Sequence, residues 1–142
     1  MLADEKGVTL VEILLSIVIL SFVLISVMNL FPQAGLLIEK NETKSNGIHA
    51  ARELLASWQG SMEAKVFLEH PSEENRPASF VKEEGGYYFF QTDIGEYIGE
   101  IRIKKAADLD SAPAKPHLVH IKVLDQKNEK ISETHGYLIV DQ

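Results

Sequence analysis

The sequence contains no cysteine, which excludes disulfide bonds and thiolate metal sites and leaves the redox compartment undefined by cysteine usage. It also has no excess of basic residues: 14 lysines and arginines stand against 21 aspartates and glutamates, a formal net charge of −7. Because contact with phosphates needs a basic surface, direct nucleic-acid binding is not expected. A Gly-rich phosphate loop, a nucleophile elbow and a convincing acid–base pair are missing as well, so we expect neither an enzyme nor a cofactor.

Long uncharged stretches are also missing, with one exception near the start of the chain. Residues 13–31 contain no charged side chain, and their polar residues are three serines and one asparagine. As an α-helix this stretch would be about 28 Å long, close to the hydrocarbon thickness of a bilayer. Serine hydroxyls can bond to carbonyls of their own helix, so they do not oppose insertion. The stretch predicts a membrane-spanning helix.

Two ordinary interpretations of such a segment are a secretory signal peptide and a plain membrane anchor. A signal peptide has a basic start and a small-residue cleavage site after its apolar core. Here residues 1–7 hold two acids and one lysine, and no such site follows the core. A plain anchor accounts for the length and hydrophobicity, but it does not account for Glu12 at the start of the run. A carboxylate within a membrane span costs several kcal/mol, and the alternative to a functional role is that Glu12 snorkels to the headgroups.

The context of Glu12 is Lys-Gly-Val-Thr-Leu-Val-Glu-Ile-Leu, residues 6–14. It resembles the class III signal sequence of type IV prepilins and type II secretion pseudopilins. The resemblance implies cleavage by prepilin peptidase between Gly7 and Val8, with methylation of the new Val8 amine. Glu12 then takes the fifth mature position, where the family has its hallmark glutamate. Val8 stands where the family usually has phenylalanine.

In a filament, the Glu12 carboxylate of one subunit could meet the Val8 amine of a neighbour. A carboxylate paired with an amine in an apolar filament core costs less free energy than a lone carboxylate in lipid. We therefore assign Glu12 a role in assembly and register, because a displaced subunit would leave a buried charge unpaired.

The remaining chain predicts an α+β fold: a long N-terminal helix, half transmembrane and half amphipathic, packed on a small antiparallel β-sheet. The expected segments are a leader (1–7), a hydrophobic transmembrane and assembly helix (8–32), an amphipathic helix (33–62) and a globular head (63–142). We expect Pro32 to bend or interrupt the helix. Three- and four-residue steps suggest one apolar helical face, formed by Leu37, Ile48, Ala51, Leu55, Trp58 and Met62.

Alternating apolar residues predict four or five strands. Gly85 and Gly86 mark a hairpin turn, residues 106–116 a connection and residues 126–129 a second turn. The expected strand positions are residues 80–81, 87–90, 97–103, 118–124 and 131–140.

The resemblance implies a structural minor pilin or pseudopilin, most similar to PilV-like minor pilins. Its partners would be other pilins or pseudopilins, prepilin peptidase, membrane lipid, and an assembly platform with its ATPase. It would sit in the cytoplasmic membrane as a single-pass protein with an extracytoplasmic head, and then enter an envelope or surface filament. The alternative is a non-polymerising single-pass protein whose head binds a ligand or a cell-wall component.

The five histidines predict no metal site. His117 and His120 lie three apart on an expected strand, so they point to opposite faces, whereas His135 could approach His120 across a hairpin. Asp108 and Asp110 lie in a loop of the kind that some pseudopilins use for calcium. They lack an oxygen-rich ligand pattern, which favours a solvated loop.

Overall fold

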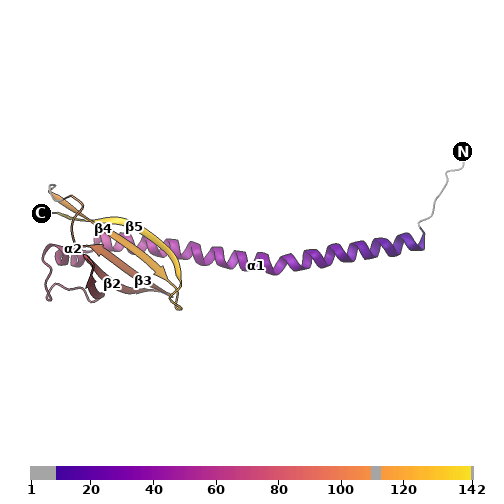
Figure 1. Cartoon of the computed structure of the whole chain (residues 1–142), viewed down its shortest axis with the longest axis horizontal. Helices are drawn as coiled ribbons and strands as arrows, with labels where there is room; N and C mark the ends of the chain where they lie inside the picture. Colours follow the sequence, from indigo (N-terminus) through magenta and orange to yellow (C-terminus); the bar gives the residue numbers. More distant parts are fainter. Residues whose placement is uncertain (1–8, 110–112, 142) are drawn as a thin grey trace. The chain divides into compact units, whose positions relative to one another are not determined.

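The computed structural model describes residues 9–109 and 113–141, and the chain divides into two units, Met1–Asn41 and Glu42–Gln142. One helix, α1 (Leu10–Gly60), contributes residues to both units. A short helix, α2 (Met62–Glu69), and five strands follow it (Figure 1). The fold is therefore the expected α+β arrangement of a long N-terminal helix and an antiparallel sheet.

The predicted interruption at Pro32 is wrong, because α1 is assigned as helix continuously from Leu10 to Gly60 with Pro32 inside it. A proline removes only its own N–H donor, which in a regular helix would reach the carbonyl of Met28. The turns on both sides are rich in leucine and isoleucine and keep their own bonds. One missing bond is therefore accommodated without ending the helix.

The sheet is a simple meander in the order β1-β2-β3-β4-β5, with every neighbouring pair antiparallel. Its strands are β1 (Phe80–Glu84), β2 (Tyr87–Ile94), β3 (Tyr97–Lys104), β4 (Ala114–Leu124) and β5 (Lys130–Asp141). Gly85 and Gly86, both with positive φ, form the predicted turn between β1 and β2. The strand β4 begins earlier than expected, at Ala114, because Pro116 lies within the strand and does not precede it.

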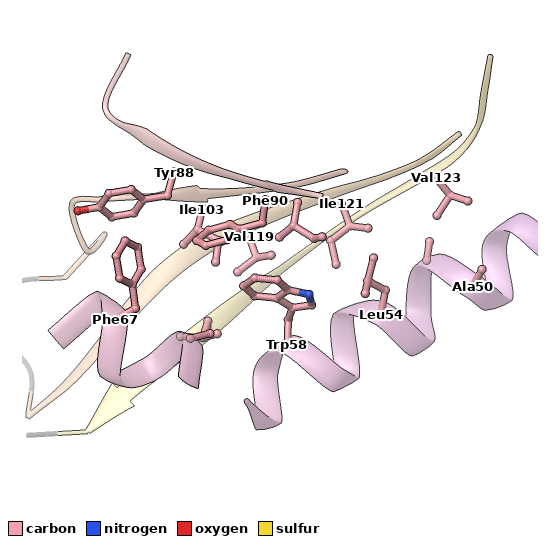
Figure 2. Packing of buried hydrophobic residues seen from close by; sticks show 14 of the residues in the cluster. Ala50, Leu54, Trp58, Phe67, Tyr88, Phe90, Ile103, Val119, Ile121 and Val123 are labelled. Carbon is pink, nitrogen blue, oxygen red and sulfur yellow. The ribbon is translucent and has the colours of Figure 1, made fainter. Parts of the chain in front are cut away.

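Within the unit formed by residues 42–142, one face of the sheet packs against the C-terminal part of α1 and against α2 (Figure 2). Trp58 of α1 meets Phe90 of β2, with ring centroids 4.7 Å apart, and Phe67 of α2 lies 4.9 Å from Tyr88. The strands contribute alternate residues to this core: Tyr88, Phe90, Ile101, Ile103, Val119, Ile121, Val123, Leu138 and Val140. The opposite face is mixed: in β3 it carries Glu100, Arg102 and Lys104, whereas in β5 it includes the exposed Ile139.

The short helix α2 was not predicted as a separate element. Ser61 caps it, with its hydroxyl accepting a hydrogen bond from the Ala64 amide at 3.2 Å. The helix then buries Ala64 and Phe67 in the core. The sequence signal was therefore a serine cap directly after the glycine that ends α1.

The buried face of α1 differs from the predicted one. Its buried residues are Gly47, Ala50, Ala51, Leu54 and Trp58, whereas Ile48 and Met62 are exposed. Three of these five residues are glycine or alanine, and their small size lets the helix approach the sheet closely. The predicted apolar face includes Ala51 and Trp58 but misses Gly47, Ala50 and Leu54.

Gly47 tests how tightly α1 packs on β5. A Cβ added at Gly47 would overlap Ile131 Cγ2 and lie 3.3 Å from Ile131 Cβ. A β-branched side chain such as Ile131 has little rotamer freedom with which to move away. We expect Gly47→Ala to lower the free energy of unfolding by about 1 kcal/mol, since overpacking outweighs the gain in helix propensity.

The matched control is Gly60→Ala in the same helix, because a Cβ there would meet nothing within 4 Å. Trp58 is the single tryptophan of the chain and lies in the core, so its fluorescence reports denaturant unfolding of the full chain in detergent micelles. Equal stability of Gly47→Ala and Gly60→Ala would refute the close approach.

Candidate functional site

The N-terminal part of α1 is an apolar helix with no protein partner among residues 9–41, the described part of its unit. Its large apolar side chains are exposed all round, from Leu10 through Ile38. Among the described residues, α1 is the helix long and apolar enough to cross a membrane, with a mean hydropathy of 2.8 in its most apolar window and none of that window buried. Water is a poor solvent for such a surface, so lipid or other apolar helices must cover it.

The three serines of this segment satisfy their hydroxyls within the helix, as predicted. Ser16, Ser21 and Ser26 each donate to the carbonyl four residues earlier, at distances of 2.7, 2.7 and 2.8 Å. Because each hydroxyl is already bonded, it does not need water at the depth of a membrane core.

Glu12 differs from these serines because it carries a charge, and the next ionisable residue along the helix is Glu39. Glu12 lies in the first turn of α1. There, its carboxylate benefits from the unpaired N–H groups and the positive end of the helix dipole. The position of the carboxylate therefore lowers the cost of keeping it within an apolar helix.

Thr9 and Glu12 form a reciprocal pair of hydrogen bonds that begins α1. The Thr9 amide donates to Glu12 Oε2 at 3.4 Å, and the Glu12 amide donates to Thr9 Oγ1 at 3.3 Å. This is a capping box, in which a threonine and a glutamate three residues later satisfy each other's amides. The Thr-Leu-Val-Glu spacing could have revealed it from the sequence, where Thr9 was given no role.

The capping box leaves Glu12 able to accept further hydrogen bonds. An ionised carboxylate offers about four lone-pair sites, and the Thr9 amide uses one of them. A second donor, such as a free amine, could therefore bind Glu12 without displacing Thr9. The other two predicted site residues, Gly7 and Val8, lie outside the described residues.

Comparison with known proteins matches residues 2–28 to the family model of the prokaryotic N-terminal methylation motif. The chain carries the N-terminal hallmark of type IV pilins. Neither the curated proteins nor the solved structures include a match to the chain. The motif and the exposed apolar helix together fit a membrane-anchored, single-pass protein.

The motif also supports a broad class for this chain and implies its general partners. It is that of prepilin-type pilins and pseudopilins, which prepilin peptidase processes, so other pilins and this peptidase are the implied partners. Such proteins are structural, and the motif favours a structural role over an enzymatic one.

The histidines of the unit formed by residues 42–142 lie as the strand pattern predicted. His120 of β4 is directly opposite His135 of β5, and their rings stack with centroids 4.5 Å apart. His117 is on the other face of β4, where its Nδ1 lies 2.9 Å from the Lys104 carbonyl. No cluster of three potential metal ligands occurs within residues 9–109 and 113–141. Asp108 forms an ion pair with Lys104 at 2.6 Å, and Asp110 lies outside the described residues.

His120 is a buried titratable group between oppositely charged neighbours. Its Nδ1 lies 3.4 Å from Arg102 Nη2, which can only donate, so Nδ1 accepts and the neutral ring carries its proton on Nε2. That nitrogen lies 3.5 Å from Glu133. Burial lowers the pKa of His120 below its ordinary value of 6.5, and His135, Arg102 and Lys122 lower it further against the opposing effect of Glu133. A proton added at Nδ1 would also break the Arg102 contact.

The capping box predicts a measurable effect of the Thr9 hydroxyl. We expect Thr9→Val to speed hydrogen exchange of the Glu12 amide about threefold, because loss of an N-cap costs about 1 kcal/mol and one backbone acceptor remains. Thr9→Ser keeps the hydroxyl and should exchange as the wild type does. Exchange measured by NMR in detergent micelles distinguishes the two variants, and an unchanged rate in Thr9→Val would contradict the capping role.

The lowered pKa of His120 predicts a loss of head stability in mild acid. Above pH 6.5 the ring is neutral in both folded and unfolded chains, so its favourable contribution is fully present. As the pH falls from 6.5 through the lower folded pKa, the unfolded chain binds the proton first, and stability is lost.

We therefore expect the Tm of the full chain to fall between pH 7 and pH 5, and His120→Gln to reduce this fall. His70→Gln, a change at an exposed histidine, should leave the fall unaltered. Thermal melts followed by Trp58 fluorescence measure the difference, and identical pH profiles for His120→Gln and wild type would exclude the proposed linkage.

Proposed function

We propose that this chain is a minor pilin or pseudopilin whose prepilin form is cut between Gly7 and Val8 and whose mature form assembles into an envelope filament. The apolar helix would first hold the subunit in the cytoplasmic membrane, with its head extracytoplasmic. An assembly platform and its ATPase would then transfer it from lipid into a pilus or secretion filament. The leader, the assembly helix, the amphipathic helix and the head would be the segments 1–7, 8–32, 33–62 and 63–142.

The observation that carries this proposal is the exposed apolar helix with Glu12 held at its first turn. Residues 13–38 include no charged side chain. The helix would therefore stay in apolar surroundings when it moves from lipid to the core of a filament. Its only barrier to either environment is the carboxylate at its beginning. A plain anchor would need the same length of helix but not this carboxylate.

The partner proposed for Glu12 is the methylated Val8 amine of a neighbouring subunit. The Thr9 amide occupies one acceptor site of Glu12, and a cationic amine would add a charge-assisted bond. In an apolar surrounding, removing one member of such a pair costs more than the pair itself contributes. The pair would therefore select the correct axial position of a subunit, since every other position leaves two charges unsatisfied.

The test has two stages, and the first is the state of the N-terminus. We expect intact mass spectrometry of the chain from a host with active prepilin peptidase to show a protein that begins at Val8 and carries one additional methyl group. A chain that keeps residues 1–7 in that host would overturn the proposal and favour a single-pass protein that does not polymerise.

The second stage is assembly in a host that supplies the other pilins. We expect Glu12→Gln to be cleaved normally but to enter the sheared filament fraction about tenfold less than wild type, because the neighbouring amine loses its charge partner. Glu53→Gln, at an exposed position of the same helix, is the matched control. Normal incorporation of Glu12→Gln would refute the assigned role.

A further inference from the structure

The head contains a pocket of about 360 Å³ where α2 ends beside β4 and β5. Its volume is within the range of pockets that hold small ligands. Small side chains, Ala106 and Ala107, form part of its wall after β3, and Leu68 and Val140 add apolar surface. The charged or titratable side chains that line it are Glu69, His70, Lys105, Lys115 and His117.

On the core-facing side of β4, basic residues follow the apolar ones at this pocket. Val119, Ile121 and Val123 are buried on that side, and the next two residues of the same alternation are His117 and Lys115. Because residues two apart on a strand share a face, these two side chains project to the side that holds the core. Lys115 is paired in register with Val140 of β5, which also lines the pocket. Two basic residues therefore replace the expected apolar ones at the end of the core.

His117 is 5% exposed, and within residues 9–109 and 113–141 only its Nδ1 has a hydrogen-bond partner. Nδ1 must donate to the Lys104 carbonyl at 2.9 Å, because a carbonyl only accepts. Among the described residues, no buried side-chain nitrogen or oxygen lacks a hydrogen-bond partner. Nε2 has no protein partner in that part of the chain, and His117 is one of the residues that line the pocket.

Basic residues outnumber acidic ones in the lining of the pocket, whereas acidic residues are in excess in the whole chain. The chain has a net charge of −7, but Glu69 is the one carboxylate among the described lining residues, against two lysines and two histidines. Glu69 lies 3.9 Å from His70, and the Lys105 ammonium contacts Glu83. Lys115 and His117 are thus the basic groups that project from one strand face into the same pocket.

We propose that this pocket binds a small oxyanion, a carboxylate or phosphate group of a soluble molecule, through Lys115 Nζ and His117 Nε2. A lysine ammonium supplies up to three donors, and a protonated imidazole supplies a donor at Nε2. The apolar wall made by Leu68 and Val140 lowers the local dielectric, which strengthens both bonds relative to an exposed site. The Lys104 carbonyl fixes the orientation of the His117 ring in advance, so binding need not order it.

The test is an NMR titration of the full chain in micelles of a neutral detergent, with inorganic phosphate and acetate as separate probes at constant ionic strength. We expect saturable shifts of the His117 ring signals and of the amides of Ala106 and Ala107. Lys115→Gln should weaken the binding about tenfold, because it removes a charge-assisted hydrogen bond. Lys127→Gln, which removes the same charge in the exposed turn between β4 and β5, should leave the affinity unchanged.

Each probe distinguishes one source of the oxyanion: saturation by phosphate assigns a phosphate group, and saturation by acetate assigns a carboxylate. Lys115→Gln retains the buried His117. Trp58 fluorescence checks that this variant is folded before it is titrated. Shifts that fail to saturate with either probe, or that are equally strong in Lys115→Gln and Lys127→Gln, would overturn the site.

Discussion

A carboxylate in an apolar helix must find hydrogen-bond donors, and this requirement shapes the N-terminal part of the chain. Glu12 meets it partly within its own subunit, through the Thr9 amide and the positive end of the helix. The same bonds define where α1 begins, so the charge and the start of the helix depend on each other. The carboxylate keeps acceptor capacity for a second donor, which in the proposed filament would be the amine of a neighbouring subunit.

The head meets a different constraint, the close approach of a helix to a sheet. Gly47, Ala50 and Ala51 present little side chain to the strands, and a Cβ on Gly136 of β5 would lie 2.9 Å from both methyl groups of Leu55. Larger residues then fill the end of the interface, where Trp58 packs on Phe90. Small residues therefore place the helix and aromatic residues complete the core, so the two sets are not interchangeable.

The sequence could predict those features whose signal is local and periodic. The apolar run, the turn at Gly85 and Gly86, and the proximity of His120 and His135 all follow from spacing along the chain. It could not predict the buried face of α1, because glycine and alanine carry little hydrophobic signal and their role depends on the distance to the sheet. Pro32 failed as a breaker because the surrounding long helix outweighs the loss of one bond. The pocket beside α2 needs three elements to meet, and no spacing within one of them reveals it.

Glu12, Lys115 and His117 are ionisable residues that interrupt apolar patterns, and each lies where desolvation costs little. Glu12 lies at the start of an apolar helix, where the backbone offers free N–H groups. Lys115 and His117 lie at the end of an apolar core, beside a pocket that a small anionic ligand could occupy. In both cases a group that breaks the apolar pattern lies at the end of an element and not in its middle, where backbone donors or open space limit the cost of desolvation. Polar residues at the ends of apolar patterns are thus the positions in this chain where binding can occur without a cost to the fold.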